Sequence, residues 1–68
     1  MATIVWCIEA PKGNFLKEVI IYVSGVRLLF SNSWDDKPLI FATEEQAIKF
    51  RKENGLIWLN ITEHMIMN

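Results

Sequence analysis

The sequence has few of the residues from which disulfides and metal centres are built. It contains one cysteine and one histidine in 68 residues. An internal disulfide needs a second cysteine, and a structural zinc site needs four ligands. Cys7 and His64 can therefore complete neither, and we expect a chain without metal that works in a reducing, cytoplasmic setting.

Motifs for catalysis and for phosphate binding are also missing. No serine or cysteine stands in a nucleophile motif, and the three glycines do not form a phosphate-binding loop. Cys7 lies in an apolar stretch, where a small hydrophobe is more typical than an attacking thiolate. The nearest approach to a carboxylate cluster lacks the alternating ligand order of a calcium loop; its members are Asp35, Asp36, Glu44 and Glu45. We expect no catalytic residue, no cofactor and no enzyme activity.

Neither sign of charge dominates, and no apolar run is long. The formal net charge is -1, so no general basic field is available to attract phosphate. The N-terminus lacks the features of a signal peptide, and no apolar run approaches the ~20 residues that span a bilayer. We expect no membrane contact and consider nucleic acid the weaker partner class. A nucleic-acid binder would use Arg27, Lys49, Arg51 and Lys52, with Tyr22 or Trp58 for stacking.

The chain is instead rich in apolar residues, which make up 51% of it. Such a content excludes intrinsic disorder. The length predicts a single small domain, residues 1–68, and domains of this size bury only about 60% of their unfolded surface. A bound partner would add buried area.

Residues 41–56 carry the clearest secondary-structure signal and predict a helix. Thr43 and Gln46 have the spacing of a helix cap, at which the side chain of each accepts a hydrogen bond from a free backbone N–H at the helix start. Gly55 supplies a stop, because glycine takes a positive φ without steric cost. The side chains expected to face a sheet are Ala47 and Phe50, with Ile48 as a further candidate.

The rest of the chain shows the alternation and β-branched content of strands. We predict an α+β fold, a mainly antiparallel sheet of four to five strands with one helix packed on one face, in the order β-β-β-(β)-α-β. Residues 63–68 lack periodicity and are expected to fray or to reach toward a neighbour. The predicted strands are residues 3–9, 15–23, 26–31 and 56–62, with a short edge strand at 39–41.

A two-residue hairpin loop at Ser24 and Gly25 sets the predicted register. It pairs Val23 with Val26, and extension through the first turn pairs Trp6 with Val19. The apolar residues of three strands then share one face, which we expect to form the core under the helix. That face contains Ile4, Trp6, Ile8, Val19, Ile21, Val23, Val26, Leu28 and Phe30.

The opposite face carries a second apolar row of Val5, Ile20 and Leu29, with Tyr22 beside it. Such a row indicates either a contact surface, for a second copy or for another protein, or the ordinary scatter of exposed aliphatic residues. The candidate partner-binding residues are these four, together with Trp34, Asp35, Asp36 and Trp58.

The two tryptophans among these candidates each have two interpretations. Trp34 either folds back over one end of the core or acts as an aromatic anchor with Asp35 and Asp36 as an acidic rim. Trp58 is either an exposed aromatic residue or a cover for the second face. The sequence leaves both alternatives open.

The segment FATEEQA at residues 41–47, followed by Phe50 and by a Gly55-Leu56 exit into a last strand, resembles many small proteins encoded by bacteriophages and prophages. The resemblance covers roughly the last half of the chain, and no functional residue carries over. It implies a binding protein that inhibits or modifies host enzymes, defence systems or transcription. We therefore expect a non-enzymatic module that occludes a bacterial host protein and forms a homodimer through the second face or the last strand. The alternative is a small nucleic-acid-binding protein.

Overall fold

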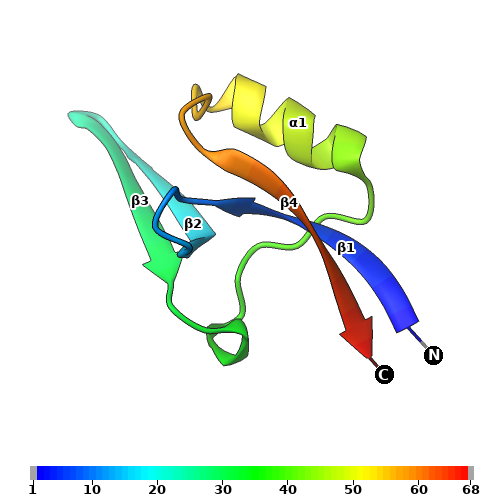
Figure 1. The fold of residues 1–68 in the computed structure, drawn as a ribbon. Coiled ribbons are helices and arrows are strands. Elements are labelled where there is room, and N and C mark those ends of the chain that lie inside the picture. The colour runs from blue at the N-terminus through cyan, green and yellow to red at the C-terminus, as the bar shows by residue number, and fades with distance from the viewer. Residues whose placement is uncertain (1, 68) are drawn as a thin grey trace.

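The computed structural model describes residues 2–67 and shows an α+β fold with one four-stranded antiparallel sheet and one α-helix (Figure 1). The strands lie in the order β3-β2-β1-β4, so the last strand pairs with the first. The elements are β1 (Ala2–Glu9), β2 (Phe15–Tyr22), β3 (Gly25–Ser31), the 3-10 turn η1 (Trp34–Asp36), α1 (Glu44–Glu53) and β4 (Asn60–Met67).

The predicted start of the helix is confirmed. Thr43 is the N-cap, and its hydroxyl oxygen accepts a hydrogen bond from the backbone N–H of Gln46 at 3.2 Å. The side-chain oxygen of Gln46 in turn accepts from the N–H of Ala42 at 3.1 Å. The two side chains thus satisfy backbone donors at the helix start, the exchange that characterises a capping box.

The predicted stop is confirmed as well. Gly55 has φ +66°, and its N–H donates to the carbonyl of Lys52. The N–H of Leu56 reaches back to the carbonyl of Arg51, which completes a Schellman motif. The helix itself is shorter than the predicted residues 41–56, because the residues at both ends of that range form the caps.

Replacing Gly55 with alanine is expected to lower the free energy of unfolding by about 1–2 kcal/mol, the cost of a left-handed conformation for a residue with Cβ. An added Cβ meets nothing within 4 Å, so the loss comes from the backbone alone. Urea unfolding of Gly55→Ala measures it. Gly55→Asn is the control, since asparagine tolerates this conformation; equal losses in both variants would contradict the explanation.

The β2–β3 hairpin differs from prediction in its loop. Tyr22 pairs with Gly25 and Ile21 with Val26, so the loop is formed by residues 23–24. The predicted loop, one residue further along the chain, is wrong. Each β2 residue in the outer part of the hairpin pairs two positions earlier on β3 than expected, and a shift of two leaves every side chain on its predicted face.

A β-bulge at Lys17 changes the face of the residues before it. Leu16 pairs with Phe30, whereas Glu18 pairs with Leu29, so Lys17 is the extra residue on β2. The bulge brings Leu16 to the same face as Val19, although the two are an odd number of positions apart. Leu16 is fully buried there, and it was absent from the predicted core.

Strands β1 and β2 separate soon after the turn that joins them. Glu9 pairs with Phe15, but Trp6 exchanges both backbone hydrogen bonds with Phe41 instead of with β2. The predicted pairing of β1 with the middle of β2 is therefore wrong. Residues 39–41 were predicted as an edge strand, but they lie between β1 and β2. Phe41 bonds to β1, and the N–H of Leu39 donates to the carbonyl of Leu16 on β2.

Strand β4 begins later and extends further than predicted. It pairs with β1 over the whole length from Glu9↔Asn60 to Ala2↔Met67. The expected fraying is wrong for residues 63–67, and Asn68 lies outside the described residues. Glu63 and His64 hide the strand from sequence inspection, because they interrupt the apolar alternation that the prediction relied on.

The core is smaller than predicted and lies at the base of the hairpin. Ile8, Leu16, Leu56 and Leu59 form its buried centre. Three residues of the predicted core face, Val19, Leu28 and Phe30, pack against this centre. Four others are exposed, and their prediction as core residues is wrong: Ile4, Ile21, Val23 and Val26.

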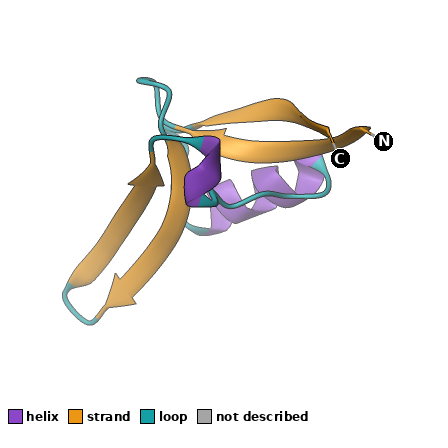
Figure 2. Ribbon diagram, turned by 90° about the horizontal axis from the view of Figure 1, so that it is seen from below, coloured by secondary structure: helices purple, strands orange, loops and turns teal. Residues whose placement is uncertain are grey.

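The core is smaller than predicted because of where the helix lies. α1 packs mainly against β1 and β4, and the outer part of the β2–β3 hairpin projects away from it (Figure 2).

Candidate functional site

The turn between α1 and β4 presents two large apolar side chains to solvent. Ile57 is 77% exposed and Trp58 is 54% exposed, while their neighbours Leu56 and Leu59 are buried. The N–H of Leu59 donates to the carbonyl of Leu56 at 3.0 Å, so Ile57 and Trp58 occupy the two central positions of a β-turn. We call residues 56–59 the apolar turn.

Both ends of the apolar turn are held by the helix. The N–H of Leu56 donates to the carbonyl of Arg51 at 2.9 Å, and the guanidinium of Arg51 donates to the carbonyl of Leu59 at 3.1 Å. The exposed pair is thereby displayed on a backbone that is fixed by hydrogen bonds and buried leucines. A partner that binds it has little conformational entropy to remove.

This geometry decides between the interpretations of Trp58. Trp58 lies before β4 begins, in a turn and not in a strand, and it is exposed rather than a cover for the second face. Alternation along the strand predicted at residues 56–62 puts Ile57 on the core side together with Leu59, and that prediction is wrong for Ile57.

Trp34 folds back onto the face of the β1–β4 pair opposite the helix. In Figure 1 η1 and α1 lie on opposite sides of these two strands. The Trp34 ring lies 5.4 Å from that of Phe15 and 5.3 Å from that of His64, between centroids. Trp34 is therefore a covering residue, as the first interpretation held, but it covers the second face rather than an end of the core.

Val5 and Cys7 lie on this same face of β1, and both are buried. Strand alternation places them with Glu9 and His64. The predicted row of Val5, Ile20 and Leu29 does not form, because β1 and β2 are no longer paired at those positions. Val5 is only 6% exposed, so it offers almost no surface to a partner.

A small polar cluster lies beside Trp34. The hydroxyl of Thr62 donates to the carboxylate of Glu9 at 3.2 Å and lies 2.7 Å from Nε2 of His64. Nε2 of His64 and Oε1 of Glu9 are 3.7 Å apart. Because the one hydroxyl proton of Thr62 goes to Glu9, Nε2 of His64 is the donor to the Thr62 oxygen. Sequence reasoning missed this cluster, which depends on the β1–β4 register and has no local signal.

The Cys7 thiol next to this cluster is buried. Burial, with a smaller contribution from the carboxylate of Glu9, raises the pKa of Cys7 to about 11. The thiol therefore keeps its proton at neutral pH, where a nucleophile would need a thiolate.

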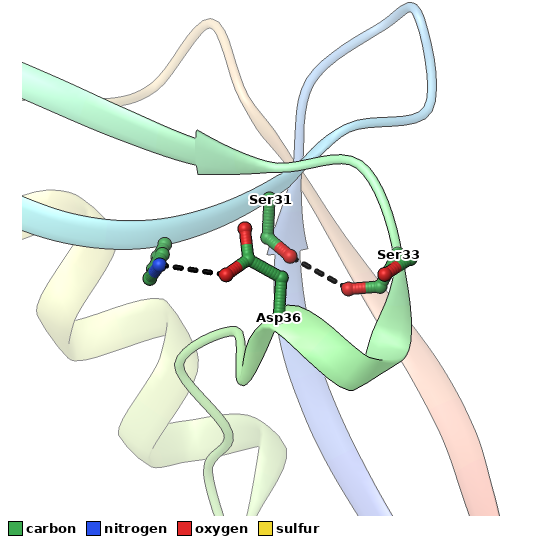
Figure 3. Close-up of polar contacts among 4 residues, drawn as sticks. Ser31, Ser33 and Asp36 are labelled. Atoms are coloured by element: carbon green, nitrogen blue, oxygen red, sulfur yellow. Dashed lines mark hydrogen bonds and ion pairs between the residues drawn. The ribbon is translucent and has the colours of Figure 1, made fainter.

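The two acids beside Trp34 have different roles. Asp36 forms an ion pair with Nζ of Lys17, the bulge residue, at 2.8 Å (Figure 3). In the same turn the hydroxyl of Ser31 donates to the carbonyl of Ser33 at 2.6 Å, and Ser31 is completely buried. These contacts hold η1, and with it Trp34, against the sheet. Asp35 is exposed.

An open groove of about 340 Å³ lies next to Trp34. Its lining is apolar except for one lysine, and the polar cluster does not open into it. The lining residues are Trp34, Lys37, Pro38, Ile40 and Ile66. Within residues 2–67, no three acidic, histidine or cysteine side chains come together as metal ligands, and no helix is long and apolar enough to cross a membrane.

The remaining candidates lie on the hairpin. Ile20 and Leu29 are half-buried, whereas Tyr22 is exposed near the loop. All three share the predicted second face, but they lie on the part of the hairpin beyond the bulge at Lys17, where β2 is not paired with β1. The predicted sites therefore fall into three separate surfaces: the apolar turn, the covered face beneath Trp34, and the hairpin.

Comparison of the chain with protein-family models, with curated proteins and with solved structures finds no significant match.

Proposed function

We propose that this protein is a non-enzymatic protein-binding module that holds its partner through the apolar turn. The observation that supports the proposal is the exposure of Ile57 and Trp58 between two buried leucines. Tryptophan is among the residues most enriched at binding hot spots, and a rigid aromatic anchor loses little entropy on binding.

The partner we propose is a bacterial host protein in the cytoplasm, whose working surface the module occludes. Its class comes from the resemblance of the helix segment to small phage-encoded proteins. The nucleic-acid alternative is less favoured, because Arg51, one of the four basic residues it requires, is half-buried and bonded to the carbonyl of Leu59.

Trp58→Ala is expected to weaken partner binding by roughly 30-fold or more, the effect of removing a hot-spot residue worth about 2 kcal/mol or more. The folded state should be little changed, because exposed substitutions usually alter stability by less than about 0.5 kcal/mol. The measurement is capture from bacterial lysate on immobilised wild type, followed by titration of the captured protein against each variant.

Ile57→Ala and Met67→Ala form the matched pair for this experiment. Both positions are about equally exposed, at 77% and 75%, but Met67 lies on β4 away from the apolar turn. We expect Ile57→Ala to weaken binding and Met67→Ala to leave it unchanged. A captured protein that binds Trp58→Ala as tightly as wild type would rule out the apolar turn as the contact.

A further inference from the structure

The outer part of the β2–β3 hairpin lacks the support that a two-stranded ribbon needs in water. β3 lies at one edge of the sheet, and in both ribbon views nothing lies beside its outer side (Figures 1 and 2). Isolated two-stranded hairpins are marginally stable at best, and a third strand or a covering layer usually stabilises them. Of the described residues, none supplies such a neighbour to β3 on that side.

The outer part of the hairpin also exposes apolar side chains on both of its strands. Ile21 is 74% exposed, and its cross-strand neighbour Val26 is 60% exposed. Free edges are normally blocked by lysine, proline or a bulge, because an open edge pairs with other chains. From Gly25 to Ser31 the outer strand has none of these, and Arg27 is its only charged residue.

From these observations we propose that two copies of the chain pair antiparallel through the outer edge of β3, about a two-fold axis at Leu28. A two-residue loop is closed by a hydrogen-bonded pair, which here is Tyr22 and Gly25. Hydrogen-bonded and non-hydrogen-bonded pairs alternate from there, so the backbone N–H and C=O groups of Val26, Leu28 and Phe30 point away from β2. In this register Leu28 meets Leu28 of the partner subunit, and Val26 lies opposite Phe30 of the partner subunit. The outward backbone groups of the two copies then lie opposite one another, and the two sheets join into one continuous sheet.

The charges on the hairpin favour a second copy of the chain as the partner that pairs with the free edge of β3. A two-fold contact brings a patch against itself, so a patch of one sign would repel its own copy. Beyond the bulge the two strands carry one acid, Glu18, and one base, Arg27. The net charge of -1 adds little repulsion between whole copies.

The area available indicates a weak dimer. The contact is confined to one strand edge, the seven residues of β3 from Gly25 to Ser31, so it is smaller than a standard interface. A standard interface buries about 800 Å² per partner, so we expect dissociation in the micromolar range. The register also aligns Val23 with Ser33 of the partner subunit, which brings each hairpin tip beside the segment before Trp34.

Sedimentation equilibrium of the purified chain, from low micromolar to submillimolar concentration, tests the dimer. Wild type should pass from monomer to dimer over this range. Val26→Lys should weaken the dimer at least tenfold, because an edge lysine blocks strand pairing. Ile21→Lys is the matched control: it adds the same charge on the same face, but on β2, and it should leave the dimer within about twofold of wild type.

Amide hydrogen exchange on wild type gives a second measurement that needs no folded variant. The N–H groups of Val26 and Leu28 should become more protected as concentration rises. A monomer at every concentration, equal weakening by Val26→Lys and Ile21→Lys, or protection that does not change with concentration would each overturn the proposal. Because the pure chain is used and the apolar turn lies elsewhere, failure of this proposal leaves the proposed function untouched, and the reverse also holds.

Discussion

Leu16→Ala is expected to lower the free energy of unfolding by about 3 kcal/mol, within the ~2–5 kcal/mol typical of a fully buried leucine. Leu16 lies in the buried centre with Ile8, Leu56 and Leu59, and its side chain has no exposed surface. A chain of 68 residues has a total stability of roughly 3–10 kcal/mol. The substitution should therefore leave the protein close to half unfolded or lower its melting temperature by roughly 15 °C.

The measurement is thermal unfolding followed by circular dichroism, with Ile21→Ala as control. Ile21 lies on the same strand and is 74% exposed, so its replacement should cost less than about 1 kcal/mol. The comparison tests the bulge at Lys17 directly, since an unbroken strand would put Leu16 on the opposite face. If Leu16→Ala costs no more than Ile21→Ala, the bulge is not formed in solution.

Raising the pH through the range from about 9 to 11 is expected to destabilise the fold through Cys7. The pKa of this thiol is raised from 9.0 to about 11, mainly by burial and then by Glu9. Below pH 9 the thiol keeps its proton in both states, and its stabilisation is present in full. Between pH 9 and 11 the unfolded chain loses the proton while the folded chain retains it, so stability falls, by roughly 2 kcal/mol over the whole range.

Urea unfolding at several pH values measures this loss, and Cys7→Ala serves as the variant that lacks the thiol. Cys7→Ala lowers stability at neutral pH because it leaves a small cavity, but its stability should fall less steeply above pH 9. Parallel pH profiles for wild type and Cys7→Ala would show that the thiol titrates alike in the folded and unfolded chains.

Local signals predicted the elements better than they predicted the core. The helix caps at Thr43 and Gly55 were read correctly, because each depends on residues within a few positions of one another. The faces of the outer hairpin were also correct. Leu16 was missed because a bulge has no distinct pattern here, and one extra residue reverses the faces on either side of it.

The candidate site shows the same division. Trp58 was recognised as a possible contact residue from its type alone, but its neighbour Ile57 was assigned to the core by strand alternation. The structure exposes both, because the chain turns between Leu56 and Leu59 before β4 begins. Folding back was one of the two interpretations of Trp34, but the surface that it covers depends on β4, whose position the sequence did not indicate.

The sequence by itself determined an apolar single α+β chain, a helix with both ends encoded, a hairpin near residue 24, and the lack of recognisable catalytic or metal motifs. Only the tertiary structure decided which residues are buried, that β4 pairs with β1, that Glu9, Thr62 and His64 meet, and that the hairpin projects. The physical reason is separation along the chain. Capping and turns are set by neighbours, whereas strand order and register depend on contacts between residues far apart in the chain, such as Glu9 and Thr62, which are 53 positions apart.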